Sequence, residues 1–297
     1  MKKSALFVVT TILLISLTGC SIFSTPKADK VVIGGKNFTE QDILVYIMKD
    51  LLETKTNLKV EVKPYLGGTS VVSQALERGD LDIYPEYTGT ALLNILGQPA
   101  INDPQAAYQR VKTIYKEQKK LIWLMPFGFN NTYTMTMRAD RAAELGIETI
   151  SDLVQHAPEM VLGSTHEFLE RIDGYKGIEK VYGMTFKDLK GMDPGLTYAA
   201  CRDQKADVID AFATDGRIQA FQLKVLKDDK QFFPPYYAAP VIREDTLKRY
   251  PQIAEVLNQL AGKLDDKQMS RLNAQVDLEK KDPKEVARQW LKEQGLI

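Results

Sequence analysis

The chain contains 297 residues, of which 44% are hydrophobic and 26% are charged, and its 39 basic residues equal its 39 acidic residues in number. This composition is typical of a globular protein with a substantial core, and the length allows one large domain or two of ordinary size. The lack of a basic excess argues against a nucleic-acid-binding protein.

The first 19 residues predict a secretory signal peptide. A basic start precedes a mostly apolar run from Ala5 to Leu17, which is too short for a good membrane span. The run ends in LTGC, which resembles a bacterial lipobox, where the cysteine is lipidated after cleavage. We therefore expect residues 20–29 to be a polar tether that starts at lipidated Cys20 and anchors the protein to the cell membrane, outside the cytoplasm. The alternative is an ordinary signal peptide with a chance cysteine.

The next part of the chain predicts alternating strands and helices. Strands are expected at Lys30–Ile33 and at Leu58–Leu66, from an apolar run and an alternating pattern. Between them, Thr39 with Asp42 three residues later predicts a capping box that opens a helix. That helix keeps four apolar residues on one face: Ile43, Leu44, Ile47 and Leu51. A second helix and a third strand follow, and this order predicts a mostly parallel sheet in an α/β fold.

The segment LDIYPEYTGTALLNILG, residues 81–97, carries the strongest functional signal. It predicts a buried strand that turns directly into a helix, with Tyr87 at the helix N-terminus beside Thr88 and Thr90. Helix N-termini favour anions through free N–H groups, and aromatic faces favour cations. The combination suits a ligand that is cationic at one end and anionic at the other.

The pattern continues in a second section, which predicts two α/β lobes. Strands are expected at Thr132–Arg138, Met160–Gly163 and Ala206–Phe212, and Phe232–Tyr237 is expected to cross back to the first section. We therefore predict a first lobe over residues 30–129 plus 238–297 and a second lobe over residues 130–237. Two crossings form a hinge, and a ligand would lie in the cleft between the lobes.

Catalytic chemistry has little support in the sequence. The two histidines, His156 and His166, do not lie in a metal-ligand spacing, and Cys201 lacks a local nucleophile signature. We expect no enzyme activity, no cofactor and no metal. A surface hydrolase that uses His166 with a nearby acid is the alternative from another class, and a lipoprotein adhesin with a vestigial cleft is a third possibility.

Several long motifs resemble one family, the substrate-binding lipoproteins of bacterial osmoprotectant ABC importers. The resemblance is colinear from about Val31 to the C-terminus. Its segments are GGKNFTEQDIL (34–44), DIYPEYTGTALL (82–93), NNTYTMTMR (130–138), FLERIDG (168–174), ADVIDAFATDGRI (206–218) and FFPPYYAAPVIR (232–243). The family implies a two-lobed, hinged α/β binding protein of the type II periplasmic-binding-protein fold, with glycine betaine, carnitine or choline as ligands.

The resemblance also implies the site residues. Four aromatic residues would form a cage for a trimethylammonium group: Tyr87, Tyr133, Phe212 and Tyr236. Phe212 stands where tyrosine is usual, and the sequence leaves open whether Tyr236 or Tyr237 points inward. Polar residues would hold the ligand carboxylate: Lys36, Thr90, Arg171 and, as a weaker candidate, Gln41.

The family implies the partners as well. These are a membrane permease of an ABC importer, driven by a cytoplasmic ATPase, and a small zwitterionic or cationic solute. The binding protein itself is expected to be a monomer.

Since Thr90 is neutral, the site should tolerate a carboxylate, and we expect betaines and carnitine to be favoured over choline alone. A receptor for another compatible solute, such as ectoine, or for another organic cation is the closest alternative.

Overall fold

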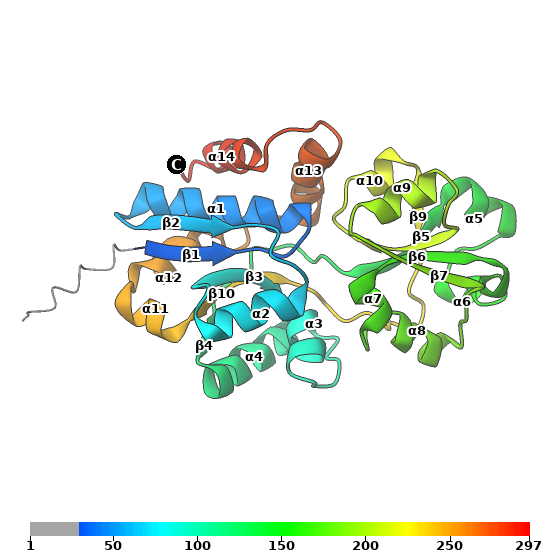
Figure 1. Ribbon diagram of the computed structural model, residues 1–297, viewed down its shortest axis with the longest axis horizontal. Coiled ribbons are helices and arrows are strands. Elements are labelled where there is room, and N and C mark those ends of the chain that lie inside the picture. Colours follow the sequence, from blue (N-terminus) through cyan, green and yellow to red (C-terminus); the bar gives the residue numbers. More distant parts are fainter. Residues whose placement is uncertain (1–29) are drawn as a thin grey trace, which may run out of the picture.

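The structure is a computed structural model that describes residues 30–297, and the predicted signal peptide, Cys20 and tether lie outside the described residues. Two five-stranded sheets, each flanked by helices, form the two halves of the molecule (Figure 1). Among residues 30–297, no helix is long and apolar enough to span a membrane. The α/β class and the two-lobed architecture predicted from the sequence are confirmed.

The first sheet has the strand order β2-β1-β3-β10-β4. Its strands are β1 (Lys30–Gly34), β2 (Lys59–Lys63), β3 (Ile83–Tyr87), β4 (Leu121–Trp123) and β10 (Ala238–Arg243). The helices of this half are α1 (Thr39–Lys55), α2 (Thr69–Arg78), α3 (Thr88–Thr90), α4 (Pro104–Ile114), α11 (Glu244–Arg249), α12 (Gln252–Leu257), α13 (Asp266–Asp277) and α14 (Pro283–Glu293). Two π-helical turns (Ala91–Ile95 and Tyr115–Lys119) and a 3₁₀ turn (Asn258–Leu260) complete it.

The second sheet has the order β7-β6-β8-β5-β9. Its strands are β5 (Tyr133–Arg138), β6 (Val161–Thr165), β7 (Asp188–Met192), β8 (Val208–Phe212) and β9 (Leu223–Val225). Its helices are α5 (Ala139–Leu145), α6 (Ile150–Leu153), α7 (His166–Glu170), α8 (Tyr175–Tyr182), α9 (Leu196–Arg202) and α10 (Arg217–Ala220), with a 3₁₀ turn at Ala157–Glu159.

Both sheets are mixed, which corrects the prediction of mostly parallel sheets. In the first sheet β1 pairs parallel with β2 and β3, whereas β10 pairs antiparallel with β3 and β4. In the second, β6 pairs parallel with β7 and β8, whereas β5 pairs antiparallel with β8 and β9. The antiparallel pairs involve β10 and β5, which are the first strands that the chain forms after it crosses from the other half.

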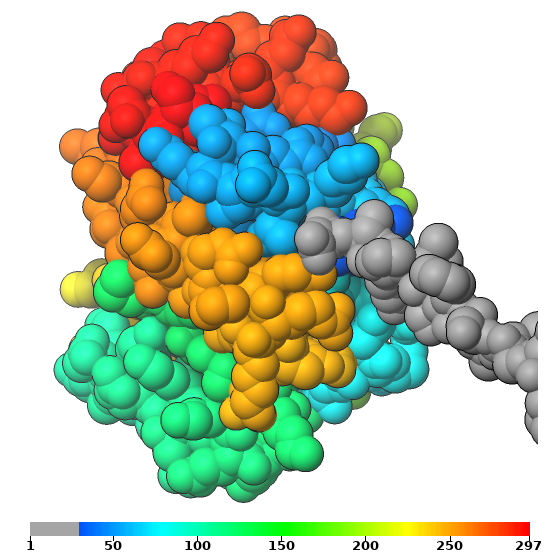
Figure 2. Space-filling model, turned by 90° about the vertical axis from the view of Figure 1, so that its left-hand side faces the viewer, coloured from blue at the N-terminus to red at the C-terminus, as the bar shows by residue number. Residues whose placement is uncertain are grey.

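Helix α1 shows how the sequence pattern becomes packing. Ile43, Leu44, Ile47 and Leu51 are fully buried, as their helical spacing predicted. The C-terminal helix α14 packs on α1, and Figure 2 shows the C-terminal residues (red) lying over this part of the chain (blue). The predicted capping box is wrong, because the Thr39 hydroxyl donates to Asp277 on α13 at 2.6 Å and the N-cap residue Phe38 makes no side-chain cap.

Two segments without regular helix or strand join the halves: residues 124–132, between β4 and β5, and residues 226–237, between β9 and β10. They contact each other in a β-bridge between Asn130 and Tyr237. The lobe boundaries at 129/130 and 237/238 stay a prediction. Cys201, the free cysteine of the described region, is buried, and burial raises the pKa of its thiol to about 12, so it is an inert core residue.

Candidate functional site

A cavity of about 210 Å³ lies between the two halves. Both halves supply its wall: Lys36, Asn37, Phe38, Gly68, Thr69, Tyr87 and Thr90 from the first, and Asn131, Tyr133, Thr165, His166, Glu167, Arg171, Met192, Asp193, Pro194, Phe212 and Tyr236 from the second or from the crossing segments. The cavity is smaller than the roughly 300–1,000 Å³ typical of drug-sized ligands, so it suits a small solute.

Strand register brings the four predicted aromatic residues to this cavity. Tyr133, the first residue of β5, is paired directly with Phe212, the last residue of β8. Tyr87, the last residue of β3, is paired with Ala238, the first residue of β10, and Tyr236 precedes that strand by two residues. Side chains that end neighbouring strands meet at one edge of a sheet, so the two edges face each other across the cavity.

The rings form a continuous aromatic wall. The centroid of Tyr133 lies 5.0 Å from that of Phe212 and 5.8 Å from that of Tyr236, the latter edge-to-face. Phe38 stacks on Phe212 at 5.1 Å and lies 6.2 Å from Tyr87, so it joins the rings of the two halves. The sequence analysis missed Phe38; its place between Lys36 and the helix start at Thr39 could have indicated it.

Tyr236 lines the cavity, and its neighbour Tyr237 does not. Tyr237 instead forms main-chain contacts, since its N–H donates to the Thr88 hydroxyl and it bridges to Asn130. The Tyr236 ring lies against Gly89, where an added Cβ would come within 2.8 Å of the ring. The glycine of the YTGT motif therefore makes room for the inward-pointing tyrosine.

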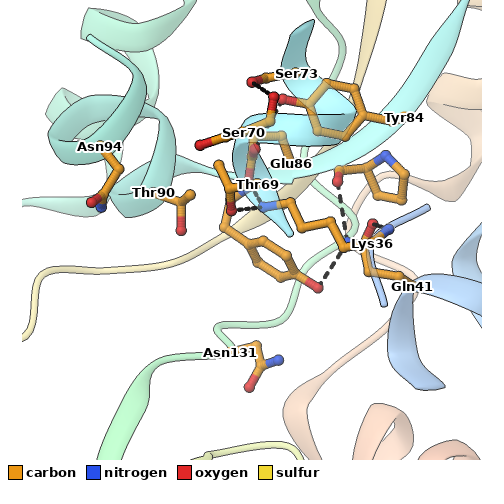
Figure 3. Close-up of polar contacts among 12 residues, drawn as sticks. Lys36, Gln41, Thr69, Ser70, Ser73, Tyr84, Glu86, Thr90, Asn94 and Asn131 are labelled. Carbon is orange, nitrogen blue, oxygen red and sulfur yellow. Dashed lines mark hydrogen bonds and ion pairs between the residues drawn. The ribbon is translucent and has the colours of Figure 1, made fainter. Parts of the chain in front are cut away.

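Lys36 reaches the cavity from the loop before α1 and is 3% exposed. Its ammonium pairs with Glu86 at 2.6 Å and donates to the Thr69 hydroxyl at 3.0 Å, as Figure 3 shows. Glu86 is fully buried and also accepts from the Tyr84 hydroxyl and the Tyr87 N–H. The Lys36 charge is therefore already balanced inside the protein. The Lys36 ammonium nitrogen lies 5.3 Å from the centroid of the Tyr87 ring.

Arg171, at the end of α7, is 5% exposed and also carries internal partners. It makes a bidentate pair with Asp173, at 2.9 and 2.6 Å, and a 2.9 Å bond to Glu167. Across the cavity it donates to the Thr90 hydroxyl at 3.1 Å, and its guanidinium lies 5.0 Å from the centroid of the Tyr133 ring. The pair of Thr90 and Arg171 thus ties the first half to the second.

Seven of the eight predicted ligand-binding residues line the cavity, and Gln41 does not. Gln41 is fully buried behind Tyr87; its amide donates to the Tyr87 hydroxyl at 3.1 Å and its oxygen accepts the Lys36 N–H. It therefore supports two lining residues from behind. The polar lining residues Asn131, Glu167 and Asp193 were not predicted, since no pattern around them distinguishes them from surface positions.

Several contacts cross the cleft and hold the halves together. Besides the pair of Thr90 and Arg171, Asn94 donates to Asp173 at 2.7 Å, and the Thr69 N–H donates to Glu167 at 3.2 Å. Within residues 30–297, no group of three or more histidines, cysteines and acidic residues could hold a metal ion. His166 lines the cavity.

The chain matches the family described as "Substrate binding domain of ABC-type glycine betaine transport system" over residues 29–293. The chain belongs to this family. It is 38% identical to the carnitine transport binding protein OpuCC of Listeria monocytogenes, over 98% of this chain and 97% of the relative. It is 40% identical to the ergothioneine transport permease/ergothioneine binding protein EgtU of Helicobacter pylori, over 90% of this chain and 48% of that longer protein.

The fold of this family member is also that of a solved relative. A crystal structure described as a glycine betaine/carnitine/choline ABC transporter matches with a TM-score of 0.74 and 35% identity, covering 90% of this chain and 99% of the other. The prediction of a solute-binding protein of an ABC importer with a type II binding-protein fold is therefore confirmed.

Proposed function

We propose that this protein captures small solutes that carry a quaternary ammonium group and a carboxylate, such as glycine betaine and carnitine, and delivers them to the permease of an ABC importer. The observation that carries the proposal is the wall of five aromatic rings around a small cavity between the two halves. A methylated ammonium group donates no hydrogen bonds, so ring faces are the groups that recognise it best.

The residues of the cavity divide the work by chemistry. Tyr87, Tyr133, Phe212 and Tyr236 form the cage for the cationic head. Lys36, Thr90 and Arg171 receive the carboxylate, and Gln41 holds Tyr87 in place. Each cage face contributes about 0.5–1 kcal/mol when exposed and about 2 kcal/mol or more when desolvated, so four faces provide several kcal/mol.

Ligand binding and cleft closure are linked in this proposal. The cage contains rings from both halves, and Arg171 bonds to Thr90 across the cleft. A ligand that contacts both walls binds the closed form better and therefore shifts the equilibrium toward it. The protein would act as a monomer without enzyme activity, tethered outside the cytoplasm by lipidated Cys20, and its closed form would dock on the permease.

The preferred solute is tested by isothermal titration of the purified protein with glycine betaine, carnitine and choline. We expect saturable, reversible binding, with the two zwitterions binding at least as tightly as choline. Choline binding more than tenfold tighter than glycine betaine would contradict the preference for zwitterions. No heat and no thermal shift with any of the three would contradict the proposal as a whole, because a ligand at 100 times its Kd adds about 2.7 kcal/mol of stability.

A competition panel addresses the alternatives. Ectoine tests for another compatible solute, and ergothioneine is included because the Helicobacter pylori relative is named for it. If ectoine or ergothioneine displaces glycine betaine at a much lower concentration than carnitine does, the substrate assignment changes while the architecture remains. A hydrolase that uses His166 predicts product formation that His166→Ala abolishes, whereas a binding protein releases its ligand unchanged.

A further inference from the structure

Two cage tyrosines each donate their hydroxyl to a buried carboxylate that lies behind the cavity wall. The Tyr87 hydroxyl donates to Glu40 at 2.7 Å, and the Tyr236 hydroxyl donates to Asp173 at 2.5 Å. Both acids are 2% exposed, and neither lines the cavity. These distances are typical of the strong hydrogen bonds formed between a hydroxyl and an ionised carboxylate.

Glu40 is held entirely by uncharged donors. Besides the Tyr87 hydroxyl, it accepts from the Asn131 amide at 2.9 Å, the Thr214 hydroxyl at 2.5 Å and the Asn273 amide at 3.2 Å. An ionised carboxylate accepts about four hydrogen bonds, so these four groups can satisfy its charged form by donating to it. The pKa of Glu40 is raised, because burial outweighs the four hydrogen bonds that oppose the shift.

Asp173 differs because its charge is balanced. It accepts two bonds from the Arg171 guanidinium and one from the Asn94 amide, in addition to the Tyr236 hydroxyl. On both tyrosines, burial and the nearby carboxylate raise the pKa of the phenol well above its usual value, so each phenol keeps its proton and can donate it in a hydrogen bond.

We propose that Glu40 and Asp173 are specificity-determining residues that act through the rings of Tyr87 and Tyr236 and strengthen their attraction for a cationic ligand head. A hydroxyl that donates to a carboxylate shifts electron density toward its ring, because hydrogen-bonded groups polarise one another. The ring face then becomes more negative, and the face is what binds the cation. Each carboxylate also attracts the cation directly from the far side of its tyrosine ring, because charges interact strongly in the buried, low-dielectric wall. This inference rests on the proposed function, because it requires the cage to hold a cation.

The other two cage rings provide an internal comparison. Phe212 has no hydroxyl, and the Tyr133 hydroxyl forms no hydrogen bond with a carboxylate in the described part of the chain. Tyr133 instead faces the Arg171 guanidinium, which opposes a second cation. We therefore expect the effect of losing the hydroxyl to be largest at Tyr87, whose carboxylate has no guanidinium partner, smaller at Tyr236, and smallest at Tyr133.

The test compares glycine betaine with its carbon isostere tert-butylacetate, in which an uncharged tert-butyl group replaces the trimethylammonium group. The measured quantity is the ratio of the two Kd values by competition titration, for the wild type and for Tyr87→Phe, Tyr236→Phe and Tyr133→Phe. These variants keep the rings, Glu40 and Asp173. Tyr237→Phe is the matched control, since Tyr237 lies beside the cage but outside its lining.

We expect Tyr87→Phe to lower the preference for the charged ligand by roughly three- to tenfold, as for losing part of a desolvated cation–π contact. Tyr236→Phe should lower it less, and Tyr237→Phe should leave it unchanged. If Tyr87→Phe weakens both ligands equally, the hydroxyl has only a structural role and the inference is overturned; the same holds if Tyr133→Phe changes the ratio most. A wild type that binds both ligands equally well would instead contradict the proposed function itself.

Discussion

The aromatic wall and the polar end of the cavity are built in opposite ways. Tyr87, Tyr133 and Phe212 lie at strand ends fixed by register, so the faces that would receive a cationic head are already in place. The polar residues Lys36 and Arg171 are instead already paired with internal carboxylates, Glu86 and Asp173. In the proposed function, a ligand carboxylate would therefore meet charges that are already balanced. The wall would provide affinity for the head, and the internal acids would control how well the tail is accepted.

Among the internal acids, Glu167 is the one that a ligand carboxylate would compete with most directly for hydrogen-bond donors. Its side chain is 33% exposed at the cavity, it bonds to Arg171, and it accepts from the Thr69 N–H at the start of α2. Although burial opposes the shift, Lys36, Arg171 and the bonds from Thr69 lower the pKa of this carboxyl, so it is ionised at neutral pH. It thus occupies donors of the kind that a ligand carboxylate would use.

The largest expected effect comes from breaking the polar end. Lys36→Met leaves Glu86 charged and buried without its cation, and we expect a loss of about 3–5 kcal/mol in the free energy of unfolding, measured by urea denaturation. Lys36→Met combined with Glu86→Gln should recover most of that loss. Lys49→Met, which removes a more exposed lysine that pairs with Glu53, should cost less than about 1 kcal/mol. If Lys36→Met lowers the free energy of unfolding no more than the control does, the pair of Lys36 and Glu86 does not stabilise the fold.

Removing rings from the aromatic wall should weaken the binding of the ligand. Tyr87→Ala combined with Tyr133→Ala removes one ring from each half, and we expect at least ~3 kcal/mol of lost binding energy, or more than a hundredfold in Kd, by isothermal titration with glycine betaine. Tyr65→Ala, an exposed tyrosine outside the cavity lining, is the control and should bind as the wild type does. Wild-type affinity in the double variant would refute the cage.

The smallest effect sharpens the comparison, because it changes the tail selectivity alone. Glu167→Gln removes the internal competitor, and the affinity for glycine betaine should rise relative to choline by about 0.5–1 kcal/mol, or roughly two- to fivefold. Titration of both ligands measures the ratio. Glu170→Gln, at the exposed end of the same helix and outside the cavity lining, should leave the ratio unchanged. A ratio that moves toward choline in Glu167→Gln would mean that this acid does not compete with the ligand carboxylate.

The sequence predicted most of the elements from local patterns, and it predicted seven of the lining residues through the family motifs. The buried face of α1 and the strand that ends at Tyr87 follow from periodicity. The direction of β10 and the hydrogen-bond partner of Thr39 could not be predicted from periodicity, since both depend on contacts between segments far apart in the chain. The motif around Lys36 indicated a basic residue in the site but not Glu86, which lies 50 residues away and balances its charge.

The same limit explains the acids behind the cage. Glu40 and Asp173 stand in motifs that the sequence analysis quoted, FTEQ and RIDG, yet nothing local distinguishes them from surface acids. The role of each depends on three or four partner residues that come together only in the folded molecule. Buried charges of this kind are visible once the hydrogen-bond partners are known, and not before.

The position of β10 has a consequence for how the molecule is made. This strand lies between β3 and β4, yet it is synthesised after the whole of the second sheet. The first sheet therefore cannot be completed until more than two hundred residues have been translated, and a nascent chain that ends earlier exposes two strand edges that have no partner. The first half can therefore complete its fold only after the second half has been synthesised.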